Sequence, residues 1–171
     1  MWPASAPPPR PDTVKLPAPV RDHDWIAARI PHQGTMCLLD GVLDWDEDVV
    51  RCVSGTHARA DNPLRAQGRL AAVCGIEYAA QAMAVHGALL AAQDDSPSPP
   101  RSGYLASVRK LELLVERLDD IDAPLLIEAR RVSGEGASVL YAFTVSAEGR
   151  TLLSGRAAVI LDAARHGTHA G

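Results

Sequence analysis

Residues 69–93, RLAAVCGIEYAAQAMAVHGALLAAQ, form the longest apolar segment of the chain. The segment contains no proline, and its most frequent residue is Ala, the best helix former. Apolar side chains occur around most of the helical circumference, which is typical of a helix surrounded by other structure. The segment therefore predicts one long helix with the rest of the protein wrapped around it.

The segments on both sides of this helix predict strands. Upstream, residues 37–45 and 48–57 alternate apolar with polar side chains and are rich in β-branched residues. Downstream, four segments have the same character: residues 104–118, 124–133, 138–149 and 151–162. Glycines at 134 and 136 and the Glu148-Gly149 pair predict hairpin turns. The sequence thus predicts an α+β fold with a run of antiparallel strands.

The chain of 171 residues has the length of one domain. Seven of the 13 prolines fall within the first 19 residues, a density that excludes regular structure there. We expect a disordered tail over residues 1–21, a single domain over 22–162 and a flexible C-terminal tail over 163–171. A short helix opens the domain, capped by Asp22 or Asp24 and ending near Ile30, because Pro31 disfavours helical geometry before it.

Composition excludes several classes of protein. The net charge of -4 and the pI of about 5.8 give no basic excess for a nucleic-acid partner. Cys37, Cys52 and Cys74 have neither the spacing of a zinc site nor that of a disulfide framework, so we expect no metal and a reducing compartment. No signal peptide and no uncharged apolar stretch long enough for a membrane span is found. We expect a cytoplasmic protein without a membrane span.

Glu77 is the residue of this helix that calls for an explanation. A buried carboxylate needs a partner or a proton, and burial favours the protonated form that a general acid requires. Gln81 follows one helical turn later, so the two side chains can form a single polar spot. The alternative is that Glu77 lies at the helix edge and is solvated.

Four further residues are candidates for the site or its surroundings. His32 follows Pro31 in a short loop and is the best imidazole candidate, with a packed loop histidine as the alternative. His57 ends a strand, and Asn62 lies in the connection that leads to the helix, so each can reach the helix start. His86 is more simply explained as a packing residue.

Two motifs together resemble a known family: IPHQGTMCLLDGVLDW at 30–45 and GIEYAAQAMA at 75–84. They are similar to the hotdog-fold 3-hydroxyacyl-acyl-carrier-protein dehydratases, and more closely to the branch found in aryl-polyene and xanthomonadin-type pigment clusters. The resemblance covers about residues 22–162. It rests on Pro31-His32 before an apolar run, and on Glu77 followed by Ala80-Gln81.

The resemblance implies a hotdog fold, in which a curved antiparallel sheet wraps around one central helix. It also implies a homodimer, or a heterodimer with a related hotdog subunit, with active sites at the subunit interface. The substrate would be a 3-hydroxyacyl thioester on an acyl carrier protein, in fatty-acid or polyene pigment synthesis. No separate cofactor is implied, because the phosphopantetheine arm belongs to the substrate.

The family pattern also implies roles for individual residues. His32 would be the base that takes the C2 proton, and Glu77 the acid that protonates the departing hydroxyl. The substrate-binding residues would be Cys74, Gly75, Tyr78, Gln81 and Asn62. Among these, backbone N–H groups near Cys74 and Gly75 would stabilise the thioester oxygen, and Gly75 would let the substrate approach. Gln81 would orient Glu77 or hold the 3-hydroxyl, and Tyr78 would line the tunnel.

One departure from the family opens alternatives. Fatty-acid dehydratases carry a His-Phe-Pro-Gly motif before the helix, where this chain has Asp61-Asn62-Pro63-Leu64. Either His32 or His57 then supplies the imidazole, or the chain is a partner subunit without full activity. An acyl thioesterase and an acyl-binding module are further alternatives. A basic rim for the acidic carrier protein is expected from Arg101, Arg109, Lys110, Arg130 and Arg131.

Overall fold

The computed structural model describes residues 15–94 and 103–161. The main elements are β1 (Arg21–Asp22), α1 (His23–Ala27), β2 (Gly41–Trp45), β3 (Val49–Ser54), α2 (Gly75–Gln93), β4 (Gly103–Leu113), β5 (Leu125–Glu135), β6 (Ser138–Ala147) and β7 (Arg150–Leu161). Short 3-10 turns occur at Gly34–Met36, Thr56–Ala58 and Ala72–Cys74.

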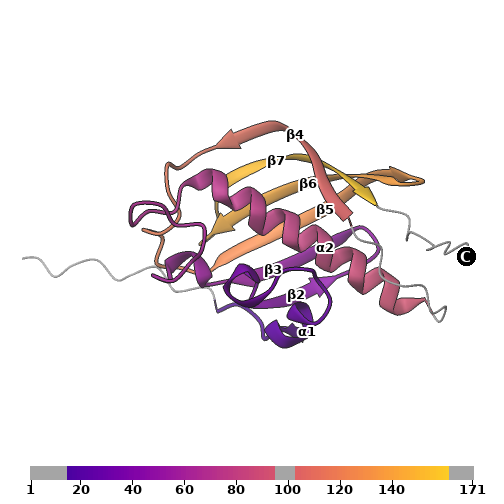
Figure 1. Ribbon diagram of the computed structural model, residues 1–171, viewed down its shortest axis with the longest axis horizontal. Coiled ribbons are helices and arrows are strands. Elements are labelled where there is room, and N and C mark those ends of the chain that lie inside the picture. Colours follow the sequence, from indigo (N-terminus) through magenta and orange to yellow (C-terminus); the bar gives the residue numbers. More distant parts are fainter. Residues whose placement is uncertain (1–14, 95–102, 162–171) are drawn as a thin grey trace, which may run out of the picture.

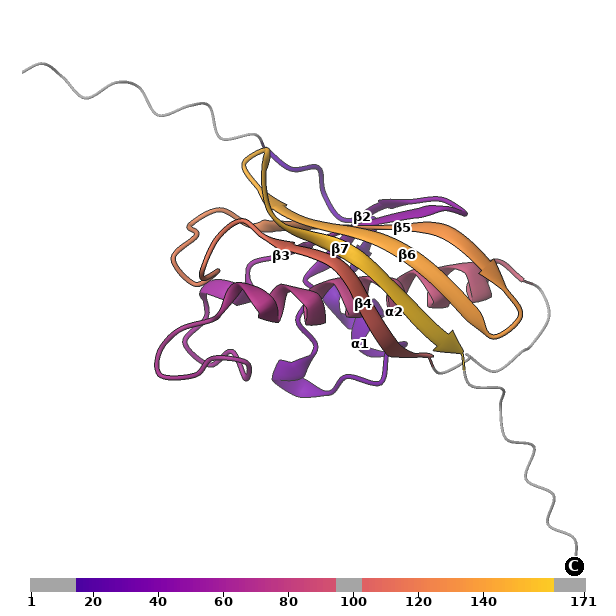
Figure 2. The same ribbon diagram turned by 90° about the horizontal axis from the view of Figure 1, so that it is seen from above.

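The seven strands form one antiparallel sheet in the order β1-β2-β3-β5-β6-β7-β4. The sheet curves over α2, which crosses one of its faces (Figures 1 and 2). After α2 the chain places β4 at the far edge, and β5 then returns to pair with β3. A curved sheet around one central helix confirms the predicted α+β layout and the hotdog fold.

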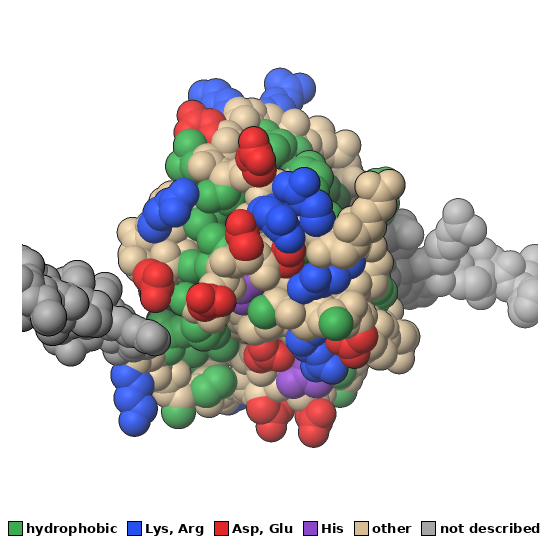
Figure 3. Space-filling view, turned by 90° about the vertical axis from the view of Figure 1, so that its left-hand side faces the viewer, with side chains coloured by type: hydrophobic (Ala, Val, Ile, Leu, Met, Phe, Trp, Pro, Cys, Tyr) green, Lys and Arg blue, Asp and Glu red, His purple; other side chains and the backbone are tan. Residues whose placement is uncertain are grey.

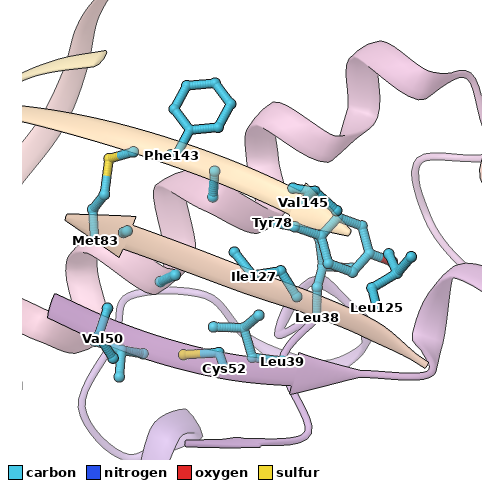
Figure 4. Close-up of a cluster of buried hydrophobic side chains, with 14 of the residues drawn as sticks. Leu38, Leu39, Val50, Cys52, Tyr78, Met83, Leu125, Ile127, Phe143 and Val145 are labelled. Carbon is cyan, nitrogen blue, oxygen red and sulfur yellow. The ribbon is translucent and has the colours of Figure 1, made fainter. Parts of the chain in front are cut away.

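The core lies between the sheet and α2. Along β6, Val139, Tyr141, Phe143 and Val145 are buried while the residues between them are more exposed, as expected for a strand with one covered face. Figure 4 shows some of these side chains beside Met83 of the helix and Ile127 of β5. The many alanines of α2 have small side chains, so the sheet can pack closely against the helix.

The observed helix begins later in the sequence than predicted. Bridge pairing of Ala66 with Arg69 and of Ala71 with Arg117 keeps the approach to the helix non-helical. The regular helix therefore begins at Gly75, after a 3-10 turn. Residues Ala72–Gln93 have the length and hydropathy of a membrane span, but half of the apolar window is buried in the protein.

The N-terminal boundary of the domain also differs from the prediction. The Val20 N–H donates to the Val42 carbonyl, and Arg21–Asp22 pairs with β2, so ordered structure begins before residue 22. Asp22 caps α1 by accepting from the Trp25 N–H, and α1 ends at Ala27, earlier than Ile30. Residues 1–14, 95–102 and 162–171 lie outside the described part, so residues 1–14 of the N-terminal tail and the whole C-terminal tail remain predictions.

Candidate active site

The structure brings His32 and Glu77 together within one chain. His32 lies in the loop between α1 and the Gly34–Met36 turn, and Glu77 lies in the first turn of α2. The His32 Nε2 and Glu77 Oε1 atoms are 3.0 Å apart, and the side chains are 25% and 33% exposed. An imidazole and a carboxylate in contact at a partly open position can exchange a proton with a small molecule.

The environment of this pair differs for the two residues. Glu77 lies in the first turn of α2, and it is less buried than the apolar helix suggested. The Nδ1 atom of His32 is buried and has no hydrogen-bond partner within the described residues. The tautomer of His32 therefore depends on the contact with Glu77.

Gln81 joins Glu77 to the loop that carries His32. Its Nε2 donates to Glu77 Oε1 at 3.1 Å and to the Met36 carbonyl at 2.7 Å. Its Oε1 accepts from the Leu38 N–H at 2.9 Å. Gln81 is fully buried, so three hydrogen bonds hold its amide in one orientation. The side chain thus fixes Glu77 and the segment after His32 relative to each other.

A buried hydroxyl network holds the same segment from its other side. The Leu38 carbonyl accepts from Ser54 Oγ at 2.5 Å and from Thr56 Oγ1 at 2.8 Å. Tyr78 Oη lies 2.9 Å from Thr56 Oγ1 and accepts from Asn62 Nδ2 at 2.9 Å. Burial raises the pKa of Tyr78, so the phenol stays neutral. Tyr78 and Asn62 are buried here, in the framework behind the site.

Cys74 and Gly75 make contacts that differ from the expected ones. The Cys74 N–H donates to the Ala71 carbonyl at 3.0 Å, and the Gly75 N–H is bonded within the same 3-10 turn. Both donors are therefore engaged, and their geometry gives no support to a role at the thioester oxygen. A Cβ at Gly75 would lie 2.5 Å from Leu153 Cδ2, so the glycine serves the packing of α2 on β7.

The other two histidines considered are buried and bonded elsewhere. His57 is 1% exposed, and its Nε2 lies 2.9 Å from the Ile121 carbonyl, which ties the Thr56–Ala58 turn to the β4–β5 connection. His86 Nδ1 lies 2.9 Å from Tyr141 Oη, and its Nε2 lies 2.9 Å from the Asp46 carbonyl. Of the candidate imidazoles, the structure therefore brings His32 to Glu77.

Sequence reasoning missed Asp119, which holds Leu70 in the segment that leads to α2. Its carboxylate accepts from the Leu70 N–H at 2.8 Å and from Arg117, and its side chain is 5% exposed. The hydrogen bond from Arg117 lowers the pKa of Asp119. The Arg-x-Asp spacing at 117–119 was the available signal, but it does not reveal the distant Leu70 partner.

The charges around this end of the molecule are mixed. Arg59 pairs with Asp61 at 3.0 Å, and Arg117 pairs with Asp119. Figure 3, which shows the end on the left of Figure 1, has acidic and basic side chains interspersed beside an apolar strip. Within residues 15–94 and 103–161, no group of three or more His, Cys, Asp or Glu side chains could hold a metal ion. The contact between His32 and Glu77 is of a kind that can transfer a proton.

Comparison with known proteins gives one match to a family model, described as ApeP-like, ApeP dehydratase, over residues 25–166. A search of curated proteins found no match.

Solved structures share the fold. A chain of the dehydratase heterocomplex ApeI:P from Xenorhabdus doucetiae aligns with a TM-score of 0.72 at 21% identity, over 81% of this chain and 91% of that chain. A putative thioesterase from Shewanella oneidensis aligns with a TM-score of 0.56 at 10% identity, over 82% and 93%. A thioesterase from Haemophilus influenzae aligns at 0.55 and 8% identity, over 75% and 82%.

Proposed function

Because the family model spans most of its length, the chain belongs to the ApeP-like dehydratase family, and we propose that its substrate is a 3-hydroxyacyl thioester on an acyl carrier protein. The observation that carries the proposal is the 3.0 Å contact between His32 Nε2 and Glu77 Oε1. Elimination of water from such a thioester needs one group to accept the C2 proton and another to protonate the hydroxyl.

In the proposed reaction, His32 Nε2 accepts the C2 proton and Glu77 gives its proton to the departing 3-hydroxyl. The electrons of the C2–H bond form the C2–C3 double bond, the C3–O bond breaks, and water leaves. An imidazolium and a carboxylate remain at hydrogen-bond distance, and this charge-assisted contact favours the pair. Return of the proton from His32 to Glu77 across the same contact restores the starting state.

The partner in a dimer is proposed to pair along β4. This strand is the edge of the sheet, and an unpaired edge can accept another strand. It exposes large apolar side chains: Tyr104, Leu105, Leu111 and Leu113, with Leu114 just beyond the strand. The heterocomplex reported for the structural neighbour supports a related hotdog subunit as the partner.

The His32–Glu77 contact within one chain concerns the alternative that this chain is a partner subunit supplying only part of an active site. The missing histidine near Asn62 suggested that a partner supplies the imidazole. Since His32 already contacts Glu77, the partner is proposed to cover the partly exposed pair and to form the acyl tunnel. A second identical or related subunit fits this role, and a carrier-borne substrate agrees with the predicted cytoplasmic location.

The five basic residues proposed to contact the carrier protein have different surroundings. Arg101 lies outside the described residues. Arg130 lies 3.8 Å from Glu128, and the Arg131 guanidinium lies close to Gly134. These two side chains therefore already have neighbours within the chain. Arg109 and Lys110 line a common depression. The carrier protein remains a proposed partner on the strength of the family.

The test follows both products from one substrate. A 3-hydroxyacyl thioester is incubated with the protein, alone and with a coexpressed hotdog subunit. Near-ultraviolet absorbance reports the enoyl thioester, and a thiol reagent reports hydrolysis. We expect enoyl product without free thiol. Free thiol without enoyl product would favour a thioesterase. This is the alternative function, because thioesterases share the fold.

A further inference from the structure

Three basic side chains share a depression on the outer face of the sheet, defined as the face away from α2. Arg109, Lys110 and Arg156 line it, and Ser107, Leu140 and Ala158 complete it, with a volume of about 400 Å³. Arg156 and Ala158 alternate along β7 with Ala157, which is buried against the core. The basic cluster therefore lies on the opposite side of the sheet from α2.

The arrangement of these cations is unfavourable without a ligand. Arg109 lies directly opposite Arg156 in the β4–β7 pairing, and like charges at such positions repel. Lys110 has a φ of 51°, in the left-handed region that non-glycine residues seldom adopt. The pairing register of β4 shifts between Arg109 and Glu112, so Lys110 lies in a bulge. Bulges of this kind redirect a side chain.

Other arginines on this face have acidic partners. Arg51 lies 2.6 Å from Asp44, and Arg130 lies 3.8 Å from Glu128. By contrast, none of the three basic residues of the depression has an ion pair within 4.0 Å among residues 15–94 and 103–161. The chain as a whole is acidic, with a net charge of -4, so the cluster is a local exception.

We propose that this depression binds the phosphate groups of a phosphorylated small molecule. Arginine forks match phosphate oxygens in a bidentate manner, and lysine adds a point charge. Three cations require more negative charge than one carboxylate carries, and a diphosphate supplies it. The concave shape and the apolar floor of Leu140 and Ala158 suit a small molecule with an apolar or aromatic part. The site goes beyond the proposed function and does not depend on His32 or Glu77.

The test is calorimetric titration of the full chain with inorganic pyrophosphate at constant ionic strength, with sodium sulfate as the reference anion. We expect saturable binding of pyrophosphate that is tighter than that of sulfate. Arg109→Gln and Arg156→Gln each weaken it by about 10-fold or more, as for loss of a charge-assisted hydrogen bond. Arg156→Lys retains part of the affinity. Without ligand, Arg156→Gln raises the melting temperature, because it removes the repulsion from Arg109.

Arg150→Gln is the matched control, because it removes the same charge from an exposed position about 20 Å along the same strand. It should change the affinity less than twofold. Equal loss in the Arg150 variant, or no saturable binding of pyrophosphate by the folded wild type, would overturn the proposal. Binding of polyglutamate without binding of pyrophosphate would also overturn it and assign the cluster to an acidic protein surface.

Discussion

Glu77 touches two polar side chains, His32 and Gln81, on a helix whose other contacts are mostly apolar. Gln81 is fully buried and also holds Met36 and Leu38, so it links the carboxylate to the loop that carries the imidazole. A catalytic pair must be held within a fraction of an ångström for proton transfer, and such precision comes from neighbours of this kind. We therefore propose that Gln81 is a positioning residue.

Gln81→Leu should lower kcat by about 10- to 100-fold with a smaller change in KM, because the His32–Glu77 geometry is loosened while the substrate pocket remains. The pH profile of kcat should also shift, since Glu77 loses a donor. Ser54→Ala is the control, as the Leu38 carbonyl keeps its bond from Thr56. Equal kcat values and unchanged pH profiles in the wild type and the Gln81 variant would show that the amide has only a structural role.

At the scale of elements, much of the fold followed from residue patterns. The alternation in residues 138–149 and 151–162 predicted β6 and β7, and the glycines between the strands adopt the expected left-handed turns at Gly136 and Gly149. The start of α2 was predicted too early, because Ala66 and Ala71 form bridges that depend on distant partners. Sequence patterns report local preference, whereas such pairings depend on tertiary structure.

The candidate site was predictable only in part. The one-turn spacing of Glu77 and Gln81 indicated their contact, and the resemblance indicated His32. The hydroxyl network of Ser54, Thr56 and Tyr78 was not predicted, because Ser and Thr are common in loops and their partners lie far away in the sequence. The close contact of Gly75 with Leu153 could not be predicted either, since it depends on where β7 crosses the helix.

Replacing two glycines of α2 by alanine should have opposite effects on stability. Gly75→Ala places a Cβ 2.5 Å from Leu153 and should destabilise the protein by about 1–3 kcal/mol through overpacking. Gly87→Ala has nothing within 4 Å of the new Cβ and should stabilise by about 0.5–1 kcal/mol. Urea unfolding measures both. A Gly75 variant as stable as the wild type would contradict the close contact.

The exposed edge of β4 predicts that a single charge there weakens subunit association. Leu113→Lys should raise the dissociation constant by at least about 10-fold, because a lysine at a sheet edge opposes strand pairing. Association is measured by sedimentation velocity, for each variant alone and for each variant with a coexpressed hotdog subunit. Val132→Lys is the control, since Val132 is an exposed apolar residue of β5, away from the edge. Association unaffected by Leu113→Lys but weakened by Val132→Lys would place the interface elsewhere.

At the scale of the whole molecule, two ionisable groups, His86 and Asp119, predict how stability depends on pH. Burial lowers the pKa of His86 from its ordinary value of 6.5, so below that pH the unfolded chain binds a proton that the folded chain does not. The Arg117 hydrogen bond lowers the pKa of Asp119 from 3.8, so protonation of the unfolded chain opposes folding again in that lower range. Stability is therefore present above each ordinary value and is lost as the pH falls.

The free energy of unfolding in urea should fall between about pH 7 and pH 5, and again near pH 4. His86→Gln should flatten the first decline, and Asp119→Asn the second. Both variants will be less stable at neutral pH, so the slopes and not the absolute values are compared. A first decline that keeps its full slope in the His86 variant would exclude this histidine as its cause.

We propose that one chain carries the complete pair for dehydration, and turnover of a 3-hydroxyacyl thioester by Glu77→Gln and His32→Ala beside the wild type tests it. Each folded variant should lose at least about 100-fold in kcat, as for removal of a general acid or base. Because the pair forms within one chain, mixing the two variants should restore no activity. Full activity of the Glu77 variant, or recovery on mixing, would contradict a catalytic His32–Glu77 pair within one chain.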